Sequence, residues 1–421
     1  MPATTDSTSI TPETTPVQKT KRSLWMVSVH VLIQVLFAVV ALVLCLECMF
    51  ALAGIGEQEY LRIDKEVGFA PMENKHVTWR KEGFSRTTFN SQGLPDRELS
   101  LSKPANTYRI AVIGDSFTEA LQVDRTQNFC SLLEKKLNQE SGGAQRFEVI
   151  NGGCSAYNLG QMYYRLKNKV MPYQPDLVLV AMSVDTIKNF AHMQGGFAFA
   201  NARPTFVIDD QGQLRFDYRI FDIWRLSPEG KRIKNTNWLR QYSHIWGVLG
   251  TIMGNLDSYK HDIISGKIWG WGTTQQALMT VQSSAKPGAA VVSESNDKAI
   301  AMPLPAPVQG PVINQTQELW PVAQAVLREM KKDCLAHDSK FVMVRLAGRP
   351  EVGYVNPQET EMFKGEASSS QTPYIDLSET FDKAKTDGKT LFYSVHLAPE
   401  GHQIVATELN RFLNSSNLLQ K

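Results

Sequence analysis

Apolar positions divide the chain into one long segment near its start and a later series of short runs. Residues Leu24 to Leu46 are almost continuously apolar. At about 1.5 Å of rise per residue, such a helix crosses a hydrocarbon core of about 30 Å. The pattern therefore predicts a transmembrane helix over 24–46. The Thr-, Ser- and Pro-rich residues before it predict a disordered tail over 1–23.

Charged residues on the two sides of this segment predict its orientation. Lys19, Lys21 and Arg22 precede it, and Glu47 follows it. The positive-inside rule then places the tail in the cytoplasm and the rest of the chain outside, in the periplasm if the cell is Gram-negative. A signal peptide cleaved after Ala53 is the alternative, although secretory apolar cores usually span only about 7–15 residues.

Short apolar strands alternate with helical patterns after a polar, loop-like lead-in over 55–104. The strands are expected at 109–113, 147–151, 176–182, 340–346 and 374–377, and the helices at 127–139, 159–170, 317–332 and 401–413. Such alternation is typical of parallel βαβ units. We therefore expect an α/β domain over 105–415, a three-layer α/β/α flavodoxin-like sandwich with a five-stranded parallel sheet.

Residues 190–315 exceed what this architecture needs, because connections in α/β units are usually only a few residues long. We interpret them as an insertion. Within it, 206–216 has the pattern of a β-hairpin, 238–253 that of a helix, and 282–311 the composition of a linker. The Trp-Gly-Trp-Gly segment at 269–272 suits a sugar-stacking surface, a bilayer contact or ordinary packing.

Composition narrows the classes of partner. The 421 residues carry a formal net charge of only +2, with no long basic run, so nothing indicates nucleic-acid binding. Three of the five cysteines, Cys130, Cys154 and Cys334, lie beyond the apolar segment, and this odd number excludes a fully paired disulfide scaffold. The Cys and His spacings are not of the metal-binding type, so neither metal nor cofactor is expected.

A candidate nucleophile follows the first strand of the predicted sheet. The strand at 109–113 runs directly into Gly114 and Ser116, at the sheet edge where open α/β sheets bind ligands. His396 lies in the loop before the last helix, at the same edge, where it could serve as a base. His402 is an alternative, although its place in the first helical turn favours capping or packing. Helix capping by Ser116 and a loop position for His396 are the corresponding structural readings.

Three segments together resemble the SGNH (GDSL) hydrolase superfamily. They are Gly-Asp-Ser ending at Ser116, Asn-x-Gly from Asn151 to Gly153, and His-Leu-x-Pro-x-Gly-His from His396 to His402. The sequence is similar in particular to membrane-anchored bacterial members that carry GDSFTE. The resemblance implies the SGNH fold and ester hydrolysis, with Ser116 as nucleophile and oxyanion donor and His396 as general base.

Two positions depart from that family on the oxyanion side. Ala156 aligns with the glycine whose N–H stabilises the oxyanion, and its N–H can serve if the backbone needs no positive φ there. Asp185 stands at the position of an asparagine donor, and a carboxyl group there donates only if it is protonated. Ser183 and Asn189 are the alternative donors.

The acid that orients the histidine is a third departure. Tyr393 stands three residues before His396, where the family has an aspartate. We therefore expect a Ser116–His396 dyad, or an acid from elsewhere, with Asp387 the nearest candidate in sequence.

Taken together, these patterns predict a membrane-anchored extracytoplasmic serine esterase. It would hydrolyse an O-acyl or O-acetyl ester through an acyl-enzyme on Ser116, with His396 as base. The expected partners are an ester substrate, with an acylated envelope glycan as one candidate, and the membrane through the N-terminal helix. A polysaccharide O-acetyltransferase and a non-catalytic SGNH-like binding or scaffold protein are the alternatives.

Overall fold

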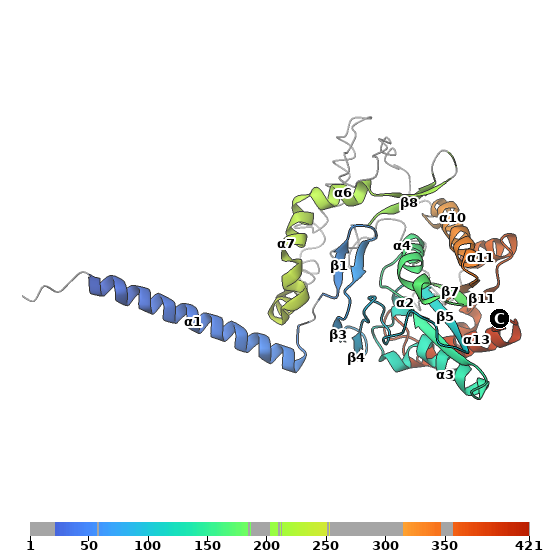
Figure 1. Ribbon diagram of the computed structural model, residues 1–421, viewed down its shortest axis with the longest axis horizontal. Helices are drawn as coiled ribbons and strands as arrows, with labels where there is room; N and C mark the ends of the chain where they lie inside the picture. The colour runs from blue at the N-terminus through green and yellow to red at the C-terminus, as the bar shows by residue number, and fades with distance from the viewer. Residues whose placement is uncertain are drawn as a thin grey trace, which may run out of the picture. The chain divides into compact units, whose positions relative to one another are not determined.

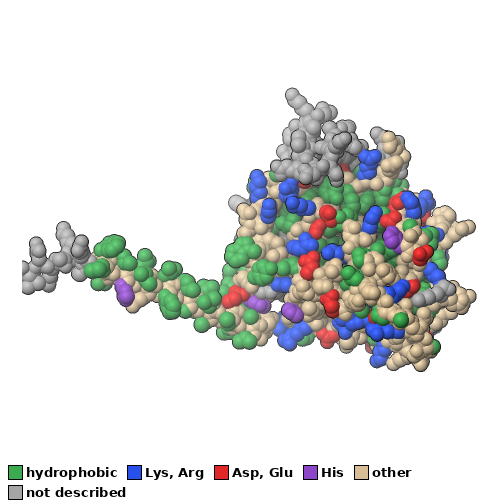
Figure 2. Space-filling model, viewed as in Figure 1, with side chains coloured by type: hydrophobic (Ala, Val, Ile, Leu, Met, Phe, Trp, Pro, Cys, Tyr) green, Lys and Arg blue, Asp and Glu red, His purple; other side chains and the backbone are tan. Residues whose placement is uncertain are grey.

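The chain divides into an N-terminal unit, 1–55, and a main unit, 56–421. The computed structural model describes residues 22–56, 59–183, 186, 203–208, 211, 213–250, 252, 315–346 and 357–420. In the first unit, helix α1 (Arg22–Ala53) is apolar along its length (Figure 2). Its stretch Trp25–Ala53 has 29 residues and contains an 18-residue window with a mean hydropathy of 2.8, so the helix is long and apolar enough to cross a membrane. The helix passes the predicted end at Leu46 and stops before Gly54, whose φ is +63°.

A five-stranded parallel sheet forms the centre of the main unit, as the sequence predicts (Figure 1). The strand order is β11-β10-β7-β5-β6, so the first strand of the sheet lies between the second and the third. This is the flavodoxin-like order. The strands are β5 (Thr107–Gly114), β6 (Arg146–Asn151), β7 (Leu177–Met182), β10 (Lys340–Arg345) and β11 (Tyr374–Asp376).

Helices cover both faces of the sheet, which makes the domain a three-layer sandwich. Successive side chains of a strand point to opposite faces, so Ala111 and Ile113 join one core cluster while Ile110 and Val112 join the other. The first cluster includes α4 (Leu159–Arg165), α10 (Gln315–Ala336) and α11 (Pro357–Ser369). The second includes α3 (Phe129–Ser141), α12 (Ser378–Thr386) and α13 (Pro399–Ser415).

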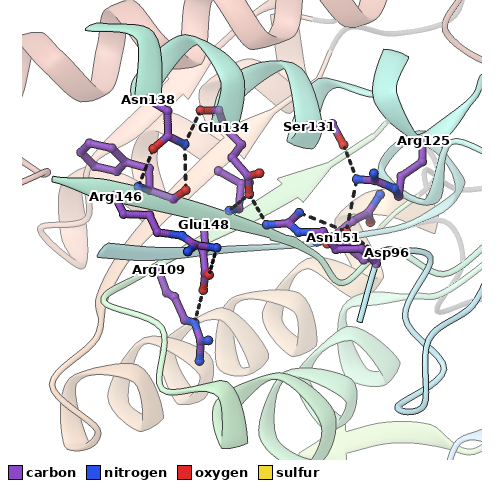
Figure 3. Close-up of polar contacts among 12 residues, drawn as sticks. Asp96, Arg109, Arg125, Ser131, Glu134, Asn138, Arg146, Glu148 and Asn151 are labelled. Carbon is purple, nitrogen blue, oxygen red and sulfur yellow. Dashed lines mark hydrogen bonds and ion pairs between the residues drawn. The ribbon is translucent and has the colours of Figure 1, made fainter. Parts of the chain in front are cut away.

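Strand β6 is an edge strand of the sheet, and side chains accept hydrogen bonds from the backbone N–H groups along its outer edge (Figure 3). Asn138 accepts from the Phe147 N–H at 2.9 Å, and Glu134 accepts from the Val149 N–H at 2.8 Å. Asp96 accepts from the Asn151 N–H at 2.9 Å. The backbone donors of this edge are thereby satisfied, and the carboxyl end of β6 is fixed in place.

The lead-in is more regular than expected. Instead of loop structure, it contains two antiparallel hairpins, β1 (Leu61–Asp64) with β2 (Gly68–Pro71), and β3 (His76–Trp79) with β4 (Ser85–Thr88). Each strand has four residues, and β4 is wholly polar, so hydrophobic alternation does not reveal it. Both hairpins contribute side chains to the core cluster on the α4 face.

The insertion is described in part. Strands β8 (Thr205–Ile208) and β9 (Leu214–Asp217) form the predicted hairpin, and α6 (Arg219–Leu226) follows. Helix α7 (Pro228–Tyr242) begins ahead of the predicted start at 238, because Ser227 caps its N-terminus and Pro228 suits the first turn. A further helical stretch covers 244–250. The segments at 269–272 and 282–311 lie outside the described residues.

Candidate active site

Ser116 opens a short helix at the carboxyl end of β5. Helix α2 (Ser116–Glu119) is capped by the Asp115 carboxylate, which accepts from the Phe117 N–H at 3.0 Å. A Cβ at Gly114 would lie 2.0 Å from Thr118 Oγ1, so the tight turn between strand and helix requires glycine there. The turn leaves Ser116 half-buried at the sheet edge where the sequence places it.

His396 reaches Ser116 from the other end of the chain. Its Nε2 lies 2.9 Å from Ser116 Oγ, although 280 residues separate the two. The imidazole ring packs against Phe117, with ring centroids 5.6 Å apart. The loop between α12 and α13 therefore lies at the same sheet edge as the β5–α2 turn, as the topology predicts.

Glu82, in the turn between β3 and β4, contacts the far side of His396. Its Oε2 lies 2.8 Å from His396 Nδ1 and accepts from the His396 backbone N–H at 3.2 Å. Its Oε1 accepts from Ser394 Oγ at 2.6 Å and from the Val395 N–H at 3.1 Å. One carboxylate thus holds both the imidazole and the loop that carries it.

The electrostatics of this contact fix the histidine tautomer. Partial burial would raise the pKa of Glu82, but the hydrogen bonds from Ser394 and His396 outweigh it and leave that pKa lowered. An ionised Glu82 favours a proton on His396 Nδ1. The Nε2 lone pair is then free to accept from Ser116, which is the geometry of a serine nucleophile, base and orienting acid.

Of the two alternatives predicted for His396, the contact with Glu82 favours an acid from elsewhere in the chain over a dyad. That acid is not Asp387, which lies at the C-cap of α12. The sequence signal for Glu82 is weak: a Glu-Gly turn between two four-residue strands, with no fixed spacing to Ser116 or His396. Gly83 adopts a φ of +63°, and a Cβ there would lie 2.4 Å from the Gln122 carbonyl oxygen.

The oxyanion side is formed by the loop after β6. The Gly152 N–H donates to the Val112 carbonyl at 2.7 Å and the Cys154 N–H donates to the Gly114 carbonyl at 3.1 Å, so the loop runs beside the β5–α2 turn. Ala156 has a φ of +62°. The condition that its backbone needs no positive φ therefore fails, and alanine occupies a left-handed conformation that favours glycine.

Two backbone donors remain available at this edge. In the part of the chain that the structure describes, neither the Ser116 N–H nor the Ala156 N–H has a hydrogen-bond acceptor. Asp185 and Asn189 lie outside the described residues. Ser183 donates its hydroxyl proton to Asp115, the cap of α2, and is therefore committed away from Ser116.

His402 has the packing role that its position predicts. It is fully buried in α13, and its Nδ1 accepts from the Phe129 N–H at 3.3 Å. Burial lowers the pKa of His402 to about 3, with a smaller contribution from His396. Among the described residues, no group of three or more His, Cys, Asp and Glu side chains is placed to hold a metal ion.

Comparisons with known proteins give a distant likeness. No family model matches the chain, and no curated protein matches it significantly. An α/β hydrolase from the Lake Arreo metagenome is similar at 13% identity and a TM-score of 0.35, over 75% of this chain and 97% of that one. A catalytic mutant of the acetylxylan esterase Axe2 from Geobacillus stearothermophilus is similar at 12% identity and a TM-score of 0.34, over 73% and 94%.

Proposed function

We propose that this chain is a membrane-anchored serine esterase that hydrolyses O-acyl esters outside the cytoplasm. The observation that carries the proposal is the continuous contact from Glu82 through His396 to Ser116, at 2.8 and 2.9 Å. A serine at such a position has a base within hydrogen-bond reach, and that base is held in the tautomer that accepts its proton.

The first half of the reaction forms an acyl-enzyme. Ser116 Oγ attacks the ester carbonyl carbon as its proton passes to His396 Nε2, and the Glu82 carboxylate stabilises the resulting imidazolium. The N–H groups of Ser116 and Ala156 donate to the oxyanion. His396 then protonates the alcohol oxygen as the carbon–oxygen bond breaks, and the alcohol leaves.

The second half restores the free serine. His396 takes a proton from water, the water oxygen attacks the acyl carbon, and a second oxyanion forms at the same donors. Collapse of this intermediate returns the proton from His396 to Ser116 Oγ and releases the carboxylic acid. If a glycan hydroxyl takes the place of water, the same residues transfer the acyl group to the glycan.

A fluorophosphonate probe tests the proposal on the full chain, because it reacts with activated serines. We expect stoichiometric labelling of the wild type and none of Ser116→Ala, while Ser415→Ala, at an exposed serine of α13, labels normally. Absent labelling of the folded protein, or equal labelling of Ser116→Ala, contradicts an esterase and favours a binding protein. With an acetylated glycan, free acetate indicates the hydrolase, whereas acetyl on an acceptor glycan indicates the transferase.

A further inference from the structure

Glu119 is the last residue of α2 and lies buried beneath the loop that carries Ala156. Only 2% of the Glu119 surface is exposed to solvent. Its Oε2 accepts from the Ser155 N–H at 3.1 Å and from the Ser155 hydroxyl. The Tyr60 hydroxyl donates to the same oxygen at 3.1 Å. Glu119 therefore connects the helix that begins at Ser116 to the residue immediately before Ala156.

The loop lies against α2 at close range. A Cβ at Gly153 would lie 2.2 Å from the Glu119 backbone nitrogen, so only glycine permits this approach. The Asn151 side chain donates to the Thr118 carbonyl at 2.7 Å and accepts from the Gly153 N–H at 2.9 Å. The loop is thus held against α2, while Arg165 of α4 donates to the Gly152 carbonyl at 2.8 Å and holds its first residues.

Ala156 needs such support because of its backbone conformation. A left-handed conformation costs an L-residue about 1–2 kcal/mol. Surrounding contacts must therefore hold it. Arg203 donates to the Ala156 carbonyl at 2.7 Å from one side, and Glu119 fixes Ser155 on the other.

We propose that Glu119 is a positioning residue for the oxyanion hole, holding Ser155 so that the Ala156 N–H points to the space beside Ser116 Oγ. The inference rests on the proposed esterase function. Glu119 touches no reacting atom. The acceptor at Oε2 is what matters, because Oε1 is buried with no hydrogen-bond partner among the described residues. In Glu119→Gln, an amide nitrogen can take the place of Oε1. The remaining oxygen then still accepts the three hydrogen bonds from Tyr60 and Ser155.

Steady-state hydrolysis of p-nitrophenyl acetate by the full chain tests this role. We expect Glu119→Leu to lower kcat by about 10- to 100-fold, because it displaces an oxyanion donor whose outright loss costs about 10²- to 10³-fold, with KM changed by less than about threefold. Glu119→Gln keeps the acceptor and should stay within about threefold of the wild type. The matched control is Glu366→Leu, which removes a buried carboxylate bonded to Arg328 and Gln324 on α10.

Equal kcat for Glu119→Leu and Glu366→Leu overturns the inference, and so does a Glu119→Gln as slow as Glu119→Leu. If Glu119→Leu does not fold, Ser155→Ala removes the hydroxyl bond to Glu119 and keeps the N–H bond; unchanged kcat together with unchanged amide exchange over 153–157 in this variant then overturns the inference. Ser116→Ala, assayed in parallel, tests the esterase function separately. Wild-type turnover by Ser116→Ala contradicts the proposed function. In that case the role of Glu119 in holding the loop is tested by amide hydrogen exchange alone.

Amide hydrogen exchange over 153–157 provides the readout that does not depend on turnover. If Glu119 holds the loop, exchange there is faster in Glu119→Leu than in Glu366→Leu and is near the wild-type rate in Glu119→Gln. Identical protection in the two leucine variants overturns the inference even if no substrate is turned over.

Discussion

At the scale of single residues, Glu82 is the side chain that holds His396 in place. Glu82 receives four hydrogen bonds from three consecutive residues, 394–396, so it both orients the imidazole and orders the loop. Tyr393, three residues before His396, instead donates its backbone N–H to the His396 carbonyl at 2.9 Å. The carboxylate that contacts His396 therefore comes from a different part of the chain than the motif around His396.

Removing the charge of Glu82 tests its role directly. We expect Glu82→Gln to lower kcat by about 10²- to 10⁴-fold, because an amide can favour the wrong imidazole tautomer and does not stabilise an imidazolium. Ester hydrolysis kinetics measure the effect. Asp387→Asn is the control and should keep the wild-type kcat. Loss of activity in Asp387→Asn with retention in Glu82→Gln would reverse the assignment.

Ala156 gives a prediction about stability. Glycine accepts a φ of +62° without strain, so we expect Ala156→Gly to raise the free energy of unfolding by up to about 1 kcal/mol, with kcat retained. Urea denaturation midpoints measure the change. In the comparison variant Ala111→Gly, in strand β5, the same substitution should destabilise the protein. A lower free energy of unfolding in Ala156→Gly than in the wild type would contradict backbone strain at this position.

Glu119 makes stability depend on pH. Burial raises the pKa of Glu119 from the usual 4.5 to about 7. Hydrogen bonds from Ser155 and Tyr60 and the charge of Arg165 lower that pKa, but burial outweighs them. The folded chain then binds more protons than the unfolded chain between these values. We expect stability relative to Glu119→Gln to fall by about 3 kcal/mol as pH rises from 4.5 to 8. Urea titrations at pH 5 and pH 8 measure this; a constant difference contradicts it.

At the scale of elements, the β3–β4 hairpin completes the site of the α/β sheet. It rests on the segment after α2, where Ser85 donates to the Leu121 carbonyl and the Arg86 N–H donates to Asp124 at 3.4 Å. Because the same segment follows Ser116, the hairpin positions Glu82 relative to the helix that begins at Ser116. The hairpin is therefore the element whose displacement should affect catalysis more than folding.

A glycine in the hairpin turn allows that displacement to be tested. In Gly83→Ala the new Cβ meets the Gln122 carbonyl oxygen and the Tyr393 ring, so the turn must shift and Glu82 with it. We expect kcat to fall at least about tenfold, with the sheet still folded by circular dichroism. Gly388→Ala has a similar positive φ, +79°, with no atom within 4 Å of its Cβ, and should keep its kcat. Equal kcat values in the two variants would contradict the argument.

At the scale of the whole molecule, a helix able to cross a membrane precedes an α/β domain with a five-stranded parallel sheet. Only Gly54 and Ile55 lie between the end of α1 and the main unit. We propose that the basic residues before the apolar segment lie on the cytoplasmic side, as the positive-inside rule predicts. The proposed esterase would therefore act close to the outer face of the membrane.

Fractionation and reporter fusions test this topology. We expect the full chain to sediment with membranes and to resist carbonate extraction, because about 20 apolar residues suffice to span the bilayer. A C-terminal alkaline phosphatase fusion should be active and a C-terminal green fluorescent protein fusion dark, as expected for export. Recovery of the intact chain in the soluble fraction, or the opposite reporter pattern, contradicts a single-pass anchor.

Local pattern determined the apolar helix, the five parallel strands, and the positions of Ser116 and His396 at one sheet edge. These features follow from hydrophobic periodicity and from the rule that parallel strands end together. Tertiary structure alone decided the identity of the orienting acid, the positive φ of Ala156 and the contact of Glu119 with Ser155. Each of these depends on a long-range contact between polar side chains or on a backbone angle, and neither leaves a periodic signal in the sequence.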